Sequence, residues 1–139
     1  MPLWARKHNE MTRDLVGGPS HPPFADPKCQ VVAELQPELG EPVVPEVTSG
    51  PAVGTNLIDD LRSRGISTVV VTGVATNVCV MGMAREFADA DFDALVVEDA
   101  CATIGRATQD AALASLATTF ASVVSSADVA FDTGGEPAG

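Results

Sequence analysis

The chain has 139 residues, which is the size of one domain, and a hydrophobic content of 45%, which argues against an intrinsically disordered protein. Its net charge of −11 argues against a nucleic-acid or an anionic-membrane partner, because both attract basic surfaces. The sequence contains no apolar run of the ~18 residues that a transmembrane helix needs, and its first residues lack the layout of a signal peptide.

The first third of the chain, up to Pro45, contains most of the prolines and shows little periodicity. Within it, Leu3–Arg6 predicts a short strand, and Gly17–Pro27, which is rich in glycine and proline, predicts a loop. Residues Val43 and Val44 predict one more short extended segment.

From Leu57 onward, apolar runs that predict strands alternate with segments whose apolar residues recur at helical spacing. The predicted elements are a helix at Leu57–Arg64, a strand at Thr68–Val71, a helix at Asn77–Ala90, a strand at Ala94–Val97, a helix at Asp110–Ala121 and a strand at Ser122–Ser125. Short loops between alternating strands and helices are typical of βαβ units. The sequence therefore predicts an α/β fold with a parallel sheet.

Local signals refine these elements. We expect Thr55 or Asn56 to cap the first predicted helix and Gly65 to end it. The β-branched run Thr68–Val71 is typical of a strand that is buried on both faces. Thr133–Gly139 predicts a disordered tail, so we expect a single domain over residues 1–132.

The most informative segment runs from Val69 to Cys79 and reads Val-Val-Val-Thr-Gly-Val-Ala-Thr-Asn-Val-Cys. It predicts a strand, a sharp turn after Gly73, and a helix near Cys79 that Thr76 or Asn77 caps. Such a turn places a thiol at the carboxyl edge of a parallel sheet, where open α/β folds bind ligands. The helix dipole favours the thiolate there, which is the nucleophilic form. Composition alone favours another interpretation, because a lone cysteine in an apolar helix is usually a small buried hydrophobe.

Further blocks accompany this segment between about Pro37 and Phe131. These blocks are Gly40–Val44, Gly54–Leu57, Leu61–Arg62, Gly65–Ile66, Gly73–Val80, Ala84–Arg85 and Val96–Ala102. Together they resemble the isochorismatase-like cysteine hydrolase superfamily, which includes nicotinamidases, N-carbamoylsarcosine amidohydrolases and isochorismatase. The resemblance implies a three-layer α/β/α fold with a mainly parallel sheet.

The resemblance also implies roles for individual residues. Cys79 is the expected nucleophile, which attacks the carbonyl carbon of an amide. The peptide bond between Val74 and Ala75 is expected to be cis, which aims the backbone N–H of Ala75 inward, beside that of Cys79. Two such donors form an oxyanion hole, and each commonly lowers the barrier by about 3 kcal/mol.

Two catalytic side chains of the superfamily have no match in this sequence. The family Asp ends a first strand, but this chain resembles the family only from the second strand onward, so we expect that strand and its Asp to be missing. The family Lys lies shortly before the block at Gly54, where Pro45 and Glu46 stand instead. Gly50–Ala52 replaces a segment that supplies an aromatic pocket wall in the family. Loss of a general base commonly costs about 10²–10⁴ in rate.

The remaining candidates carry weaker signals. Cys29 and Cys101 have no catalytic context, and three cysteines without a framework spacing predict a reducing compartment. Asp99 ends a predicted strand, where it either faces the site or caps the loop, and the loop is favoured. We expect His8 and His21 on the surface. Nothing resembles the metal cluster of the metal-binding nicotinamidases, so we expect neither a metal nor another cofactor.

Two functional hypotheses follow. The first is a cysteine hydrolase that cleaves an amide or another C–N bond of a small molecule through Cys79. The second is a truncated or degenerate, catalytically impaired member that serves as a fragment or interaction module. The signature favours the first for the family, and the unmatched Asp and Lys favour the second for this chain as a catalyst. We expect a cytoplasmic homo-oligomer with a small-molecule substrate.

Overall fold

The computed structural model describes residues 31–44 and 49–130. The chain divides into two compact units, Met1–Thr48 and Ser49–Gly139. In the first unit, the described residues form one short 3-10 helix, η2 (Ala33–Leu35).

Several sequence predictions concern the parts around these described residues. Val43 and Val44, where the sequence predicts a short extended segment, belong to no strand. The strand predicted at Leu3–Arg6, the loop at Gly17–Pro27 and the tail at Thr133–Gly139 lie outside the described residues.

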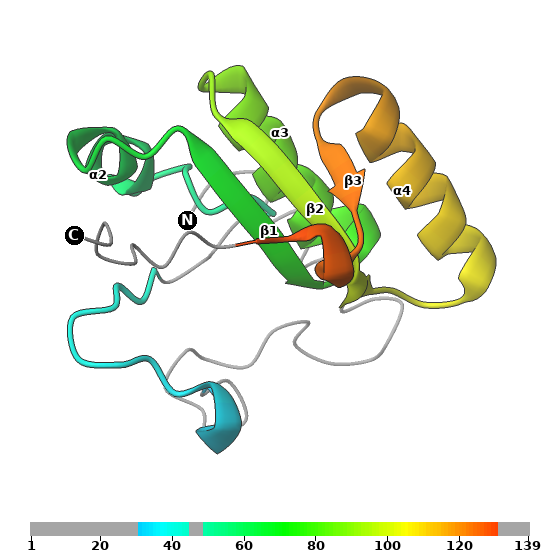
Figure 1. The fold of residues 1–139 in the computed structure, drawn as a ribbon, viewed down its shortest axis with the longest axis horizontal. Helices are drawn as coiled ribbons and strands as arrows, with labels where there is room; N and C mark the ends of the chain where they lie inside the picture. The colour runs from blue at the N-terminus through cyan, green and yellow to red at the C-terminus, as the bar shows by residue number, and fades with distance from the viewer. Residues whose placement is uncertain (1–30, 45–48, 131–139) are drawn as a thin grey trace, which may run out of the picture. The chain divides into compact units, whose positions relative to one another are not determined.

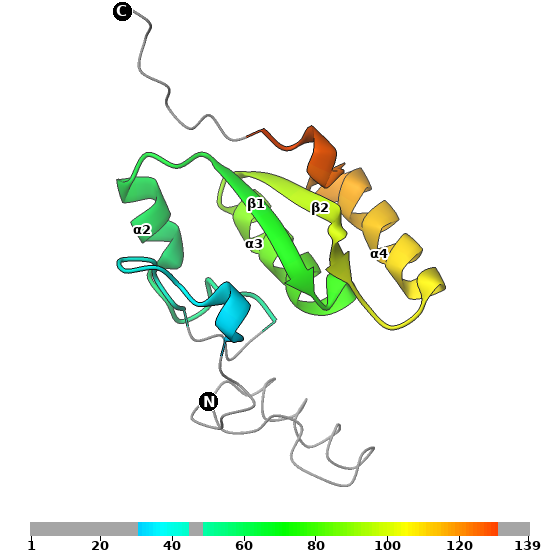
Figure 2. The same cartoon turned by 60° about the horizontal axis from the view of Figure 1, so that its bottom comes forward.

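The second unit contains a parallel sheet of three strands in the order β1-β2-β3. Its elements are α2 (Leu57–Ser63), β1 (Thr68–Val74), the π-helical turn η3 (Thr76–Val80), α3 (Met81–Asp89), β2 (Asp93–Ala102), α4 (Arg106–Thr119), β3 (Ser122–Val124) and the 3-10 helix η4 (Ser126–Asp128). Helix α3 lies against β1 and β2, and α4 runs beside β3 (Figures 1 and 2). The α/β fold with a parallel sheet and flanking helices is thereby confirmed.

Strand β1 is buried on one side rather than on both, which corrects the sequence prediction. Val71 is 1% exposed, whereas its neighbour Val70 is 38% exposed. Thr68 and Thr72, which share a face with Val70, are also exposed. The prediction failed because the β-branched residues on both faces of a strand look alike in the sequence, whether or not a layer covers them.

The buried face of β1 joins a core that the strands share with α3 and α4. The core residues are Val71, Val80, Ala84, Phe87, Phe92, Ala94, Val96, Cys101 and Leu116. Phe87 and Phe92 meet edge to face, with ring centroids 5.7 Å apart. Helix α2 adds partly buried apolar residues to this core.

Two strands extend further than the sequence predicted. β1 continues through Gly73, whose φ of +114° only glycine adopts readily, and the register with β2 shifts between Val71 and Gly73. Beyond this irregularity the strands pair again, with Gly73 opposite Cys101 and Val74 opposite Ala102. The carboxyl ends of β1 and β2 therefore meet at one edge of the sheet.

The helix ends follow local chemistry. Asn56 is the N-cap residue of α2 and its side chain makes no capping hydrogen bond, while the hydroxyl of the preceding Thr55 accepts the backbone N–H of Leu57 at 3.3 Å. Gly65 follows the end of α2 with a φ of +71°. Helix α4 begins at Arg106, ahead of the predicted start at Asp110, and an ion pair of 2.8 Å joins these two side chains. No helix in the described parts of the chain is long and apolar enough to cross a membrane.

Candidate active site

Cys79 lies in η3, the single π-helical turn that connects the carboxyl end of β1 to α3. The peptide bond between Val74 and Ala75, just before this turn, is cis, and it is the same peptide that the resemblance implicated. Cys79 is partly exposed, while the next residue, Val80, is 1% exposed and belongs to the core. Isolated π-turns inside helices are frequent at functional sites.

The start of η3 corrects the sequence prediction of a cap by Thr76 or Asn77. Ala75 is the N-cap residue, and no side chain caps the turn. The Ala75 carbonyl instead accepts the backbone N–H groups of Val78 at 3.0 Å and Val80 at 3.3 Å. The predicted single helix from Asn77 is thus a π-turn followed by an α-helix.

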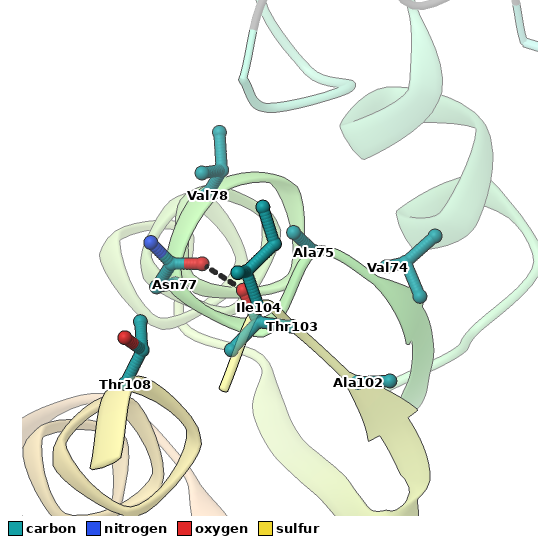
Figure 3. A pocket seen from close by; sticks show the side chains of 8 residues that line it. All are labelled: Val74, Ala75, Asn77, Val78, Ala102, Thr103, Ile104 and Thr108. Atoms are coloured by element: carbon teal, nitrogen blue, oxygen red, sulfur yellow. Dashed lines mark hydrogen bonds between the residues drawn. The ribbon is translucent and has the colours of Figure 1, made fainter. Parts of the chain in front are cut away.

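The side chains of Thr76 and Asn77 bind other elements instead. Thr76 is 0% exposed, and its hydroxyl donates to the Gln109 Oε1 on α4 at 2.7 Å. Gln109 Nε2 in turn donates to the backbone carbonyl of Cys101 at 3.2 Å. The Thr103 hydroxyl donates to Asn77 Oδ1 (Figure 3). Both residues therefore tie the turn to the segment around the end of β2.

A pocket of about 580 Å³ opens between this turn and the end of β2 (Figure 3). Its described lining residues are uncharged: Val74, Ala75, Asn77, Val78, Ala102, Thr103, Ile104 and Thr108. Cys79 is not among them, but its neighbour Val78 and the cis peptide are. Ile104 is 91% exposed and lies at the rim, so the pocket is open to solvent.

The segment after Ser49 is held against α3 by close backbone contact. An ideal Cβ on Gly82 would lie within 3.0 Å of the Ser49 carbonyl oxygen, so only glycine permits this approach. Glu86 Oε2 accepts the backbone N–H of Ala52 at 2.8 Å. Gly82 lies three residues after Cys79 in the sequence, so the segment after Ser49 contacts the helix that follows the π-turn.

The Asp99 side chain binds a segment further along the chain, which agrees with the loop-capping role that the sequence favoured. Its carboxylate accepts the backbone N–H of Ser126 at 2.8 Å and also the Ser126 hydroxyl. The side-chain hydrogen bond from Ser126, followed by the backbone one, holds the pKa of Asp99 below its ordinary value of 3.8. Asp99 thereby fixes η4 to the end of β2.

Cys101 is a core residue and not a second reactive thiol. Burial raises the pKa of its thiol above the ordinary value of 9.0. Its Sγ lies 3.8 Å from the Val71 carbonyl oxygen, to which the thiol donates. The burial and the hydrogen bond of Cys101 agree with the structural role that the sequence analysis gave it.

Several sequence candidates lie outside the described residues: His8, His21, Cys29, Pro45 and Glu46. Within residues 31–44 and 49–130, no group of three His, Cys, Asp or Glu side chains is arranged to hold a metal ion.

Sequence reasoning missed Gln109 and Glu86. Each makes its contact through a side chain to a segment more than thirty positions away, Gln109 to Thr76 and Glu86 to Ala52. No local spacing predicts such a pair. A polar residue on the buried side of α4 was the one available signal for Gln109.

Comparisons with known proteins agree with this geometry. Ureidoacrylate amidohydrolase RutB of Klebsiella pneumoniae subsp. pneumoniae is 41% identical over 92 residues, which are 66% of this chain and 39% of that protein. The chain spans less than half the length of the curated relatives it matches.

Solved structures show the same fold. An isochorismatase family protein from Desulfovibrio vulgaris superposes with a TM-score of 0.75 and 28% identity, covering 86% of this chain and 62% of that one. One from Burkholderia thailandensis gives a TM-score of 0.72 and 35% identity, covering 81% and 60%. The Isochorismatase domain model matches residues 4–128, and the chain therefore belongs to the isochorismatase family.

Proposed function

We propose that this chain hydrolyses an amide or related C–N bond of a small molecule, with Cys79 as the nucleophile. The observation that carries the proposal is the position of Cys79, which lies partly exposed in the π-turn at the carboxyl end of β1. Family membership and the similarity to ureidoacrylate amidohydrolases support the same chemistry.

The proposed reaction has two steps. The Cys79 thiolate attacks the carbonyl carbon, a C–S bond forms, and the backbone N–H groups of Ala75 and Cys79 stabilise the oxyanion. The C–N bond then breaks, and the leaving amine takes a proton from water. A water molecule cleaves the resulting thioester, which yields a carboxylate and restores the thiol.

In this proposal the proton of the Cys79 thiol passes to water, because the described lining of the pocket contains no charged side chain that could accept it. Cysteine tolerates the lack of a base better than serine, since a few per cent of it is thiolate at neutral pH.

The pocket favours a neutral substrate. Its described lining contains no charged side chain, and apolar groups of Val74, Val78 and Ile104 face it (Figure 3). A carboxylate placed there would lose hydration without gaining a cationic partner from these residues. We therefore propose an uncharged amide whose acyl or amine part is apolar.

The test measures ammonia release from a panel of primary amides and N-substituted ureas that includes nicotinamide and ureidoacrylate. We expect Cys79→Ala to abolish release and Cys29→Ser to leave it unchanged. Mass spectrometry of the quenched wild-type reaction should show the acyl group on Cys79. Release that persists in Cys79→Ala would contradict the proposal.

The second hypothesis, an impaired fragment or interaction module, has no support in the comparisons, whose curated relatives are amidohydrolases. The compartment and assembly state belong to the proposal. We propose the cytoplasm, because the three cysteines of the sequence lack the spacing of a disulfide framework. We also propose an assembly of more than one copy, because Val74 and Ile104 expose apolar surface. Light scattering on the purified chain tests the assembly.

A further inference from the structure

A hydrogen bond of the Thr76 side chain connects the candidate site to α4, a helix that is distant in the sequence. Thr76 follows Ala75, whose N–H is a proposed oxyanion donor, and it is fully buried. A buried hydroxyl without a partner is costly, so its bond of 2.7 Å to Gln109 Oε1 restricts how the turn sits. Three residues after Thr76, the same turn carries Cys79.

The second bond of Gln109 fixes the direction of the first. Its Nε2 donates to the Cys101 carbonyl at 3.2 Å, and a backbone carbonyl can only accept. The Gln109 amide oxygen must therefore face Thr76, whose hydroxyl must donate. One side chain on α4 thus joins η3 to the end of β2 with a single arrangement of donors and acceptors.

We propose that Gln109 is a positioning residue of this site, which acts through Thr76 to hold the backbone N–H groups of Ala75 and Cys79 where the oxyanion forms. This inference rests on the proposed function. Oxyanion donors stabilise the transition state only when they are fixed within about 0.5 Å of the productive geometry. A turn that rotates around Thr76 would misplace both donors while Cys79 kept its access to solvent.

The test uses a reaction that forms a tetrahedral adduct at a carbonyl carbon but releases no leaving group. Benzaldehyde labelled with ¹³C at its carbonyl adds to the Cys79 thiol: the C–S bond forms, the π pair moves to oxygen, and the thiol proton ends on that oxygen. The ¹³C signal then moves from the carbonyl region to the hemithioacetal region. Titration followed by NMR gives the dissociation constant of the adduct.

We expect Thr76→Val and Gln109→Leu each to weaken the adduct about tenfold. The double variant should also lose about tenfold rather than a hundredfold, because the two side chains act as a unit. Thr76→Ser, which keeps the hydroxyl, should bind as the wild type does. Asp110→Asn, next to Gln109 on α4, is the matched control and should change nothing, since the Asp110 carboxylate pairs with the exposed Arg106.

Alkylation by iodoacetamide separates positioning from general loosening, because that reaction generates no oxyanion. We expect the alkylation rate of Cys79 to stay unchanged in Thr76→Val and Gln109→Leu. If Thr76→Val and Gln109→Leu bind benzaldehyde as tightly as the wild type, the inference is overturned and the proposed function stays intact. The same conclusion follows if adduct affinity and alkylation rate fall in parallel in these variants. A wild-type chain that forms no adduct and releases no ammonia would refute the proposed function and the inference together.

Discussion

The carbonyl oxygen of Ser49 occupies the space where a side chain on Gly82 would begin. Gly82 lies on α3, so this contact brings the backbone of the preceding segment directly onto the helix that follows Cys79. On the same helix, Glu86 accepts the N–H of Ala52 at 2.8 Å. The segment from Ser49 to Ala52 is therefore held on α3, the helix that follows the turn with Cys79.

Replacing Gly82 by alanine is expected to destabilise the protein by about 1–3 kcal/mol, because the new methyl group must displace a backbone carbonyl. The direction of the change in unfolding free energy tests the contact, because Gly→Ala in an open helix interior stabilises the protein by about 1 kcal/mol. Urea denaturation of Gly82→Ala measures the difference. A more stable variant would contradict the close approach of Ser49.

Gly50→Ala is the matched comparison. Its Cβ would meet the carboxylate of Glu86, which is the far end of a flexible side chain and can move. We expect a smaller loss of unfolding free energy than in Gly82→Ala, and we expect Glu86→Ala to remove much of it. Equal losses in the two glycine variants would contradict this reading of the two contacts.

Much of the second unit could be predicted because its strands and helices carry periodic apolar residues. The elements from α2 to β3 all exist, and two of their bounds differ from the predictions next to a glycine. The sequence predicts a strand that ends at Val71, yet β1 continues through Gly73, whose φ is +114°, to Val74. Helix α4 begins at Arg106, four residues before the predicted Asp110, directly after Gly105, whose φ of +79° turns the chain into the helix.

The candidate site was also predictable only in part. Cys79 and the Val74–Ala75 peptide could be placed from one contiguous segment. The roles of Thr76 and Asn77 could not, because each side chain had a local option, the helix cap, and a distant partner that the sequence does not show. The burial of β1 was misjudged for a related reason, since composition alone does not reveal which face a layer covers.

Asp99 predicts an acid-sensitive contact at η4. Hydrogen bonds from Ser126 lower the pKa of Asp99, so its carboxylate form is favoured in the folded state. The stabilisation is therefore present above pH 3.8, the ordinary value, and is lost as the pH falls through the lowered folded value. We expect Asp99→Asn to speed hydrogen exchange of the Ser126 amide at about pH 5 and to have little effect at about pH 2.

Glu98→Gln serves as the control for that experiment, because Glu98 is an exposed acid next to Asp99 on β2. The ratio of variant to wild-type exchange should stay near one for Glu98→Gln at both pH values. A constant ratio for Asp99→Asn across the two pH values would show that the contact does not depend on the ionised carboxylate.

The two described thiols are expected to differ strongly in reactivity. Burial raises the pKa of Cys101, so its neutral form stabilises the fold below pH 9.0, and that contribution is lost as the pH rises through the folded value. At about pH 8 iodoacetamide should label Cys79 rapidly and Cys101 only at the rate of unfolding. Peptide mapping reads the two sites separately.

Two further samples complete the labelling experiment. In guanidinium chloride, where the core is exposed, Cys101 should label as fast as a free cysteine. In native Cys79→Ala, Cys101 should remain slow, which shows that its protection does not depend on competition with Cys79. Rapid native labelling of Cys101 would be incompatible with its place in the core.

Ile104 offers a way to change the charge preference of the pocket. It lines the rim and is 91% exposed, so a polar substitution there leaves the core intact. A cation at this position attracts a carboxylate by about 1 kcal/mol through water, which corresponds to about fivefold in kcat/KM. We expect Ile104→Arg to raise the ratio of kcat/KM for ureidoacrylate over nicotinamide by about that factor, and we expect added salt to reduce the gain. Ile104→Gln is the control, because its side chain is long and polar but uncharged, and it should leave the ratio unchanged. An equal shift in Ile104→Gln would show that the size of the side chain at this rim, rather than its charge, selects the substrate.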